Sequence, residues 1–275
     1  VPPPPARAYQ IELFEKAKDR NAIVVLGTGL GKTRVAAMII EHVLKRPENE
    51  ERVVVCLEKN RNLVPQLKEM LDAYFYQEND PDFIGGYVGG DSVRMPQWSD
   101  LKTLHRIVVM TPQIFYDGRM EARDEGQRPL ADVALLMLDE AHDAKKEHDY
   151  AKLIDLWRGE RDAGVTTAQL PQILGLTATP AWADTPEATI VKLQALCEKM
   201  MGEIVQVEDK KEDMEAYTNE TAEWLHLIEE RGGFVTCFRH FPRILQQLRL
   251  CSVIIIVGCA LAPRDAADAH PLAEL

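Results

Sequence analysis

The stretch "VVLGTGLGKTRVA", from Val24 to Ala36, carries the strongest indication of the fold. It begins as a short apolar strand, passes through a loop with glycines at positions 27, 29 and 31, and opens a helix with a Lys–Thr pair. Glycines let a loop curl until successive backbone N–H groups point at one centre, and the N-terminus of the following helix adds a partial positive charge. The stretch therefore predicts a phosphate-binding loop between a strand and a helix.

We expect the residues of this loop to surround nucleotide phosphates. Lys32 would reach the β- and γ-phosphates, and the Thr33 hydroxyl would ligate Mg²⁺. Leu26 stands where the strict pattern GxxxxGK[ST] has its first glycine. On this motif alone, a structural turn that holds no nucleotide is the alternative. The complete set of expected loop residues is Leu26, Gly27, Thr28, Gly29, Leu30, Gly31, Lys32 and Thr33.

Short, β-branched apolar runs recur along the chain and predict buried parallel strands, because they are nearly continuous in apolar character rather than alternating. Helix-like stretches at Thr33–Lys45 and Arg61–Tyr76 lie between the runs, and such alternation predicts an α/β fold with a doubly wound, mostly parallel sheet. The expected strands are Ile23–Leu26, Val53–Leu57, Ile107–Met110, Leu135–Leu138 and Gln172–Leu176.

The carboxyl-terminal part changes in character. A helix is expected to start at Thr185-Pro186-Glu187 and to end at Gly202, and the charged segment Glu203–Glu230 is expected to form a largely helical arm. We divide the chain into a nucleotide-binding domain at 1–205, a charged helical arm at 206–232 and an atypical, partly disordered tail at 233–275.

Composition limits the class of protein. Apolar residues make up 46% of the 275 residues and charged residues 28%, as in ordinary globular proteins. The net charge of −12 gives no indication of a basic surface that binds nucleic acid. The five cysteines form no CxxC pair, which favours free thiols and a cytoplasmic or nuclear location. The apolar run at 250–262 is shorter than the roughly 20 residues that span a bilayer.

A second motif, "LLMLDEAHDA", places Asp139 and Glu140 directly after an apolar strand. A carboxylate at a strand end beside the phosphate loop suits a Mg²⁺ ligand, so we assign Asp139 to the metal with Thr33. The adjacent Glu140 would orient and deprotonate the attacking water. An acidic N-cap is the structural alternative.

A third motif, "LGLTATP", places Thr177 and Thr179 after another apolar strand. Their hydroxyls can hydrogen-bond the segment Asp139–His142. A change in the bound phosphates would then be transmitted through these hydrogen bonds to another surface of the protein.

In their order along the chain, GxGKT, DEAH and TAT resemble the first RecA-like domain of a superfamily 2 DExH-box helicase. The lead-in "RAYQIELFEKAKDRNAIVVLGTG" and the extension "DEAHDAKKEHDYAKLI" are similar to the Dicer and innate RNA-sensor branch, with His148-Asp149-Tyr150 in place of "HPY". The resemblance covers 6–217. It implies that Arg7 and Gln10 read the adenine of ATP, and that His142 acts with Thr177 and Thr179 in coupling.

The same resemblance implies contacts with the backbone of double-stranded RNA at Asn62, Gly89, Gly90 and Thr111. It also implies a second RecA-like domain in cis, which supplies arginines to the ATP site. No arginine motif of that kind follows Thr179, so we expect a truncated Dicer-like protein that binds ATP–Mg²⁺ and hydrolyses it slowly. A binding module without turnover and half of a DNA helicase or translocase remain as alternatives.

Overall fold

The computed structural model describes residues 4–78, 80–89, 97–143, 149–178 and 194–217. They belong almost entirely to one compact unit, Val1–Glu215, and the second unit, Ala216–Leu275, is described only at its first two residues. No helix of the described part is long and apolar enough to cross a membrane. The predicted tail at 233–275 and most of the predicted arm lie outside the described residues.

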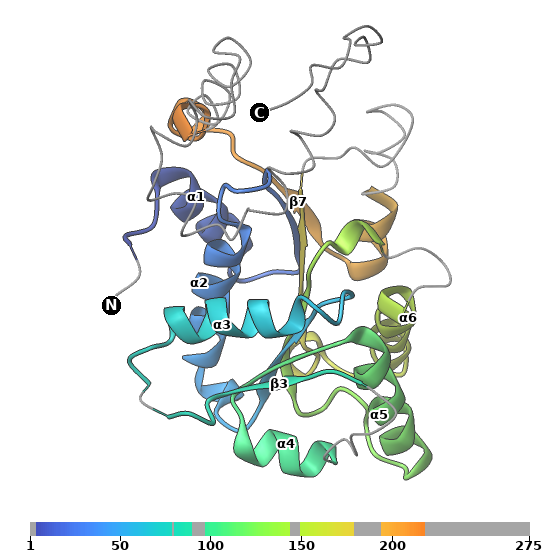
Figure 1. The fold of residues 1–275 in the computed structure, drawn as a ribbon. Coiled ribbons are helices and arrows are strands. Elements are labelled where there is room, and N and C mark those ends of the chain that lie inside the picture. The colour runs from blue at the N-terminus through green and yellow to red at the C-terminus, as the bar shows by residue number, and fades with distance from the viewer. Residues whose placement is uncertain (1–3, 79, 90–96, 144–148, 179–193, 218–275) are drawn as a thin grey trace, which may run out of the picture. The chain divides into compact units, whose positions relative to one another are not determined.

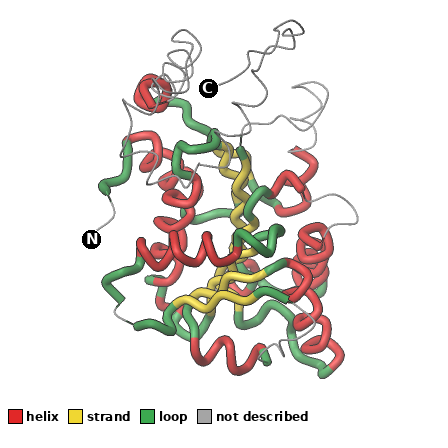
Figure 2. The backbone as a smooth tube through the Cα atoms, in the orientation of Figure 1, coloured by secondary structure: helices red, strands yellow, loops and turns green. Residues whose placement is uncertain are grey.

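Seven strands form one sheet in the order β3-β4-β2-β5-β6-β1-β7, and every pair is parallel. Figure 2 shows the strands in yellow between the helices. The predicted doubly wound sheet is therefore confirmed. The strands are β1 (Ala22–Val25), β2 (Val53–Leu57), β3 (Ile84–Tyr87), β4 (Ile107–Met110), β5 (Val133–Leu138), β6 (Gln172–Thr177) and β7 (Glu203–Val205).

Helices cover both faces of the sheet (Figure 1). The chain moves from β1 through β2 to β3 in one direction across the sheet and then returns, so right-handed crossovers place the later helices on the opposite face from the earlier ones. The earlier helices are α2 (Lys32–Leu44) and α3 (Val64–Tyr74), and the later ones are α4 (Trp98–Leu104), α5 (Pro112–Asp124) and α6 (Asp149–Asp162). Helix α1 (Ala8–Ala17) precedes β1 and contacts α2.

The central strands are buried on both faces, as their apolar composition predicts. Every residue of β2, β4 and β5 is buried. Short 3₁₀ turns lie at Pro47–Asn49, Ala141–Asp143 and Thr167–Gln169. Because all strands are parallel, their carboxyl ends meet at one edge, where parallel α/β sheets bind ligands.

The structure corrects several boundaries. The helix expected at Arg61–Tyr76 begins only at Val64 and ends at Tyr74. The segment expected to start the helical arm instead begins with edge strand β7, which pairs with β1. The start predicted at Thr185 lies outside the described residues, but residues 194–200 are helical as expected. The left-handed residue that follows this helix is Met201, with φ of 51°, one residue before the expected end at Gly202.

Candidate active site

The phosphate loop joins the end of β1 to the start of α2. Gly29 and Gly31 have φ of 80° and 87°, a left-handed backbone that glycine adopts without the steric cost of a side chain. A Cβ on Gly31 would lie 2.4 Å from Nε2 of Gln10, whereas one on Gly29 would meet no atom within 4 Å. The loop is thus packed on one side and open at Gly29, which leaves room for a ligand there.

Helix α1 holds this loop through one carbonyl. The Tyr9 hydroxyl and Nε2 of Gln10 both donate to the Leu30 carbonyl, at 2.8 and 2.9 Å. Arg7 completes the arrangement: its Nη1 donates to the Tyr9 hydroxyl at 2.9 Å, and its N–H donates to Oε1 of Gln10 at 3.0 Å. The two residues predicted to read adenine therefore lie against the phosphate loop, with the Gln10 amide hydrogen-bonded to protein on both sides.

Strand β5 delivers Asp139 and Glu140 to the same edge. The Asp139 N–H extends the ladder by donating to the Leu57 carbonyl at 3.0 Å. Glu140 has φ of 46°, a conformation that is unusual for a residue with a side chain and that turns the chain sharply after the strand. Oε1 of Glu140 lies 3.6 Å from Nζ of Lys32. The structure thus brings together the catalytic residues predicted from two separate motifs.

Two further residues lie beside Asp139. The hydroxyl of the fully buried Tyr150 lies 2.9 and 2.8 Å from the carbonyl oxygens of Leu57 and Asp139 and shares its one proton between them. Glu58, which is 6% exposed, follows Leu57, the register partner of Leu138, and so lies next to Asp139 across β2 and β5. Burial raises the pKa of both carboxyl groups, the charge of Glu140 adds to the rise in both, and the charge of Asp139 adds to the rise in the pKa of Glu58.

The sequence analysis missed Glu58. It follows β2 as one charge in the polar run "EKNRN", which reads as a solvated loop. Only the pairing of β2 with β5 places it beside Asp139, so the single sequence offers no direct indication of its position.

His142 and Thr177 meet as predicted from the third motif. Nδ1 of His142 lies 3.1 Å from both the Thr177 hydroxyl and Oε2 of Glu140. Thr177 donates its own hydroxyl proton to the Ala178 carbonyl, so its oxygen accepts from Nδ1–H of His142. This chain of contacts links the carboxyl ends of β5 and β6. Thr179 and His148 lie outside the described residues.

The residues predicted to contact nucleic acid lie after the adjacent strands β2, β3 and β4. Asn62 is exposed, Gly89 is partly buried and Thr111 is the N-cap of α5. The Arg61 guanidinium donates to the Gly89 carbonyl and joins two of these loops. Gly90 lies outside the described residues. The sequence analysis did not include Arg61, although a cation beside Asn62 suits a phosphate backbone.

The donor set fits Mg²⁺ bound together with a nucleotide. No cluster of three His, Cys, Asp or Glu side chains that could hold a metal by themselves occurs in the described part. Mg²⁺ is commonly held by one or two protein oxygens together with substrate phosphates and water. Thr33, in the first turn of α2, and Asp139, at the end of β5, are of that kind.

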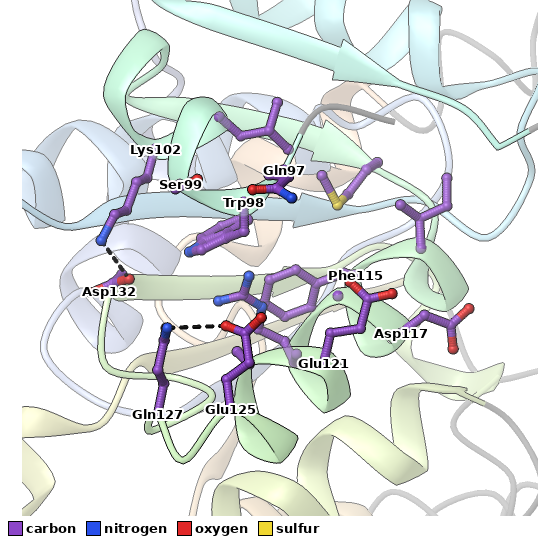
Figure 3. A pocket seen from close by; sticks show the side chains of 16 residues that line it. Gln97, Trp98, Ser99, Lys102, Phe115, Asp117, Glu121, Glu125, Gln127 and Asp132 are labelled. Atoms are coloured by element: carbon purple, nitrogen blue, oxygen red, sulfur yellow. Dashed lines mark hydrogen bonds and ion pairs between the residues drawn. The ribbon is translucent and has the colours of Figure 1, made fainter. Parts of the chain in front are cut away.

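A separate pocket of about 590 Å³ lies between α4 and α5 (Figure 3), and none of the residues predicted to bind nucleotide lines it. Arg119, 2% exposed, stacks 4.0 Å from the Trp98 ring centroid and donates to the Pro129 carbonyl. Burial lowers the pKa of Arg119 to about 10. Lys102 pairs with Asp132 at its margin, at 2.9 Å. These contacts join α4 to α5 and to the loop before β5.

Fold and site together define a RecA-like helicase domain. The family model for the DEAD/DEAH box helicase matches residues 7–188, and the chain belongs to this family.

Known proteins agree with this assignment. The chain is 35% identical over 182 residues to Dicer-like protein 1 of Phaeosphaeria nodorum and 34% identical over 196 residues to that of Pyricularia oryzae. These matches cover 63% and 67% of this chain but 11% of each relative, so the chain spans about a tenth of their length. The crystal structure of the Pyrococcus furiosus Hef helicase domain aligns with a TM-score of 0.58 and 27% identity, over 77% of this chain and 40% of that one.

Proposed function

We propose that this chain is the ATP-binding RecA-like domain of an RNA-dependent ATPase of the Dicer-like kind. The observation that carries the proposal is the convergence of the phosphate loop and the Asp139–Glu140 pair, with Nζ of Lys32 3.6 Å from Oε1 of Glu140. A cation and two carboxylates at a helix N-terminus suit a phosphate–metal complex far better than an acidic N-cap does.

Each side chain has a distinct role in this proposal. Lys32 binds the β- and γ-phosphates, and Thr33 and Asp139 hold Mg²⁺, which neutralises the charge that develops on the phosphates. Glu140 accepts the proton of the attacking water. His142 contacts both Glu140 and Thr177 on β6, so a change at Glu140 during hydrolysis would shift Thr177. Thr179 extends this coupling. Arg7 and Gln10 fix the loop and face the adenine.

For the nucleic acid, we propose the backbone of double-stranded RNA. The curated relatives are named Dicer-like proteins, which supports RNA over DNA. Loops after β2, β3 and β4 present Asn62, Gly89 and Thr111, and Gly90 follows in sequence. Backbone N–H groups and small polar side chains recognise shape rather than base sequence.

We also propose a second RecA-like domain in cis. The relatives are about nine times longer than the part that this chain matches, which leaves room for such a domain. Arginines supplied in this way contribute about 10³–10⁵ to the rate in nucleotide hydrolases. The 275-residue chain alone would therefore bind ATP–Mg²⁺ weakly and turn it over slowly.

ATP turnover by the purified chain tests the proposal, measured alone and with double-stranded RNA, single-stranded RNA or double-stranded DNA. We expect slow turnover that Glu140→Gln lowers further, with exposed Glu51→Gln as the matched control. Nucleotide binding with no turnover would favour a binding module, and stimulation by DNA alone would favour a DNA translocase. Turnover unchanged by Glu140→Gln would remove the role assigned to Glu140.

A further inference from the structure

The pocket between α4 and α5 contains a buried cation whose hydrogen bonds are incomplete. Arg119 of α5 lines this pocket of about 590 Å³ and is 2% exposed. Its Nη1 donates to the Pro129 carbonyl at 3.3 Å, but its Nε and Nη2 are buried and have no hydrogen-bond partner among the described residues. Buried donors without partners are costly and uncommon in native proteins, so this pair of nitrogens requires an explanation.

The two unpartnered nitrogens share one edge of the guanidinium group. The Nε–H and one N–H of Nη2 point in the same direction, and this fork matches the two oxygens of a carboxylate. Nε1 of Trp98 is a third buried donor without a partner in the described part, and the Trp98 ring centroid lies 4.0 Å from Cζ of Arg119. All three nitrogens can only donate, so the group that completes them is an acceptor.

Aromatic rings form the apolar part of the same pocket. The Phe115 ring centroid lies 5.5 Å from Cζ of Arg119, and the Trp98 and Phe115 rings pack edge to face with centroids 5.5 Å apart. A ligand that reaches the guanidinium fork from the pocket therefore also meets apolar surface, which suits a carboxylate on an aliphatic stem.

The rim of the pocket is acidic. Asp117, Glu121 and Glu125 are exposed and line the pocket, and Figure 3 shows their side chains along one side of it. These carboxylates repel a ligand that is anionic throughout, such as phosphate or a nucleic acid, and they attract positive charge. The complementary ligand thus combines a carboxylate, an apolar stem and a cationic group.

We propose that this pocket binds the carboxylate of a zwitterionic ligand. The Arg119 fork and Nε1 of Trp98 bind the carboxylate, the aromatic rings pack on the stem, and the cationic group lies at the acidic rim. A small molecule of the amino-acid type has this chemistry, and so does a peptide in which glutamate is flanked by lysines. The inference stands apart from the proposed ATP site, because none of the residues predicted to bind nucleotide lines the pocket.

A structural clamp is the competing explanation, since Arg119 also joins α4 to α5 and an ordered water could complete its free edge. Arg119→Lys keeps the positive charge but lacks the planar fork. Arg123→Lys, on an exposed residue of the same helix, is the matched control. Glu121→Gln removes one charge from the rim and leaves the buried edge of Arg119 in place.

The experiment follows the Trp98 indole N–H of the 275-residue chain by NMR, with the signal assigned by its absence from Trp98→Phe. The probes are ε-aminocaproate, its amide and hexanoate. We expect a saturable shift with ε-aminocaproate, none with the amide and weaker binding of hexanoate. Arg119→Lys should weaken the binding of ε-aminocaproate by roughly tenfold or more, and Arg123→Lys should leave it unchanged. Glu121→Gln should reduce the preference for ε-aminocaproate over hexanoate.

Three results would overturn the proposal: no saturable shift with ε-aminocaproate, an equal shift with its amide, or unchanged affinity in Arg119→Lys. Should circular dichroism show that Arg119→Lys is unfolded, the Glu121→Gln comparison decides, and an unchanged preference would overturn the assignment of a zwitterion. The peptide acetyl-Lys-Leu-Glu-Leu-Lys-amide distinguishes the sources of the carboxylate. Tighter binding than that of ε-aminocaproate would identify a protein segment as the ligand, and weaker binding would identify a small molecule.

Discussion

The carboxyl edge of the sheet has two halves that are built differently. Over β5, β6 and β1, polar side chains from separate elements pair with one another, as His142 does with Thr177 and Lys32 with Glu140. Over β2, β3 and β4, the loops are more exposed and are joined mainly through main-chain groups, as Arg61 joins the Gly89 carbonyl. The first half is preorganised for a compact, charged ligand, and the second suits an extended backbone.

The largest effect should follow from Lys32→Ala in the first half. Lys32 is mostly buried beside Glu140 and provides the only proposed cation for the phosphates in the described part. Loss of charge-assisted hydrogen bonds of about 1.5–3 kcal/mol should weaken nucleotide binding by roughly 10–100-fold and leave RNA binding unchanged. Isothermal titration calorimetry measures both, with Lys45→Ala at the exposed end of α2 as the control. A parallel loss of RNA affinity would show that the halves are not separable.

Tyr150→Phe should mainly affect stability. The buried hydroxyl shares its one proton between the Leu57 and Asp139 carbonyls, so the variant removes a buried donor from both acceptors. The free energy of unfolding should fall by about 1–3 kcal/mol in urea denaturation. Exposed Tyr76→Phe should change it by less than about 0.5 kcal/mol. Equal effects of the two variants would contradict the role of Tyr150 in joining β2 to β5.

Glu12→Gln should reveal a pH-dependent link between α1 and the segment after β7. Burial alone would raise the pKa of Glu12, but hydrogen bonds from Lys16 and from the N–H groups of Glu208, Asp209 and Lys210 outweigh it and lower the pKa to about 2. A depressed pKa means that the stabilisation is complete above the ordinary pKa near 4.5 and is lost as the pH falls toward 2.

The wild type should therefore exceed Glu12→Gln in stability by about 1 kcal/mol at pH 7, a value that allows for partial screening by solvent. The difference should shrink between pH 4.5 and pH 2 in thermal unfolding. Glu15→Gln, whose exposed side chain pairs with Lys18, is the matched control. A difference that stayed constant across this range would contradict the assignment.

The smallest effect should come from Asn62→Ala in the second half. One exposed amide on a phosphate backbone contributes about 0.5–1 kcal/mol, so affinity for double-stranded RNA should fall by roughly two- to fivefold. Fluorescence anisotropy with a labelled duplex measures the change, and nucleotide affinity serves as the internal control. If nucleotide affinity fell instead, Asn62 would belong to the first half.

The sequence predicted five of the seven strands because β-branched apolar runs are characteristic of buried parallel strands. It did not predict β3, whose Gly85 and Gly86 have low strand propensity; a Cβ on Gly85 would lie 2.5 Å from the His105 ring. It missed β7 because Glu203–Val205 lies in a charged segment and is a strand only by pairing with β1. Glu58 was missed for a related reason, since its neighbour depends on strand order.

Hydrogen–deuterium exchange with each ligand in turn tests the two-part edge most directly. An ATP analogue with Mg²⁺ should slow exchange at 27–33 and 139–142, and double-stranded RNA should slow it at 59–63, 87–89 and 111–114, with little overlap. Protection of the phosphate loop by RNA in the absence of nucleotide, or protection of the β2–β4 loops by nucleotide alone, would contradict the division of the edge into two binding regions.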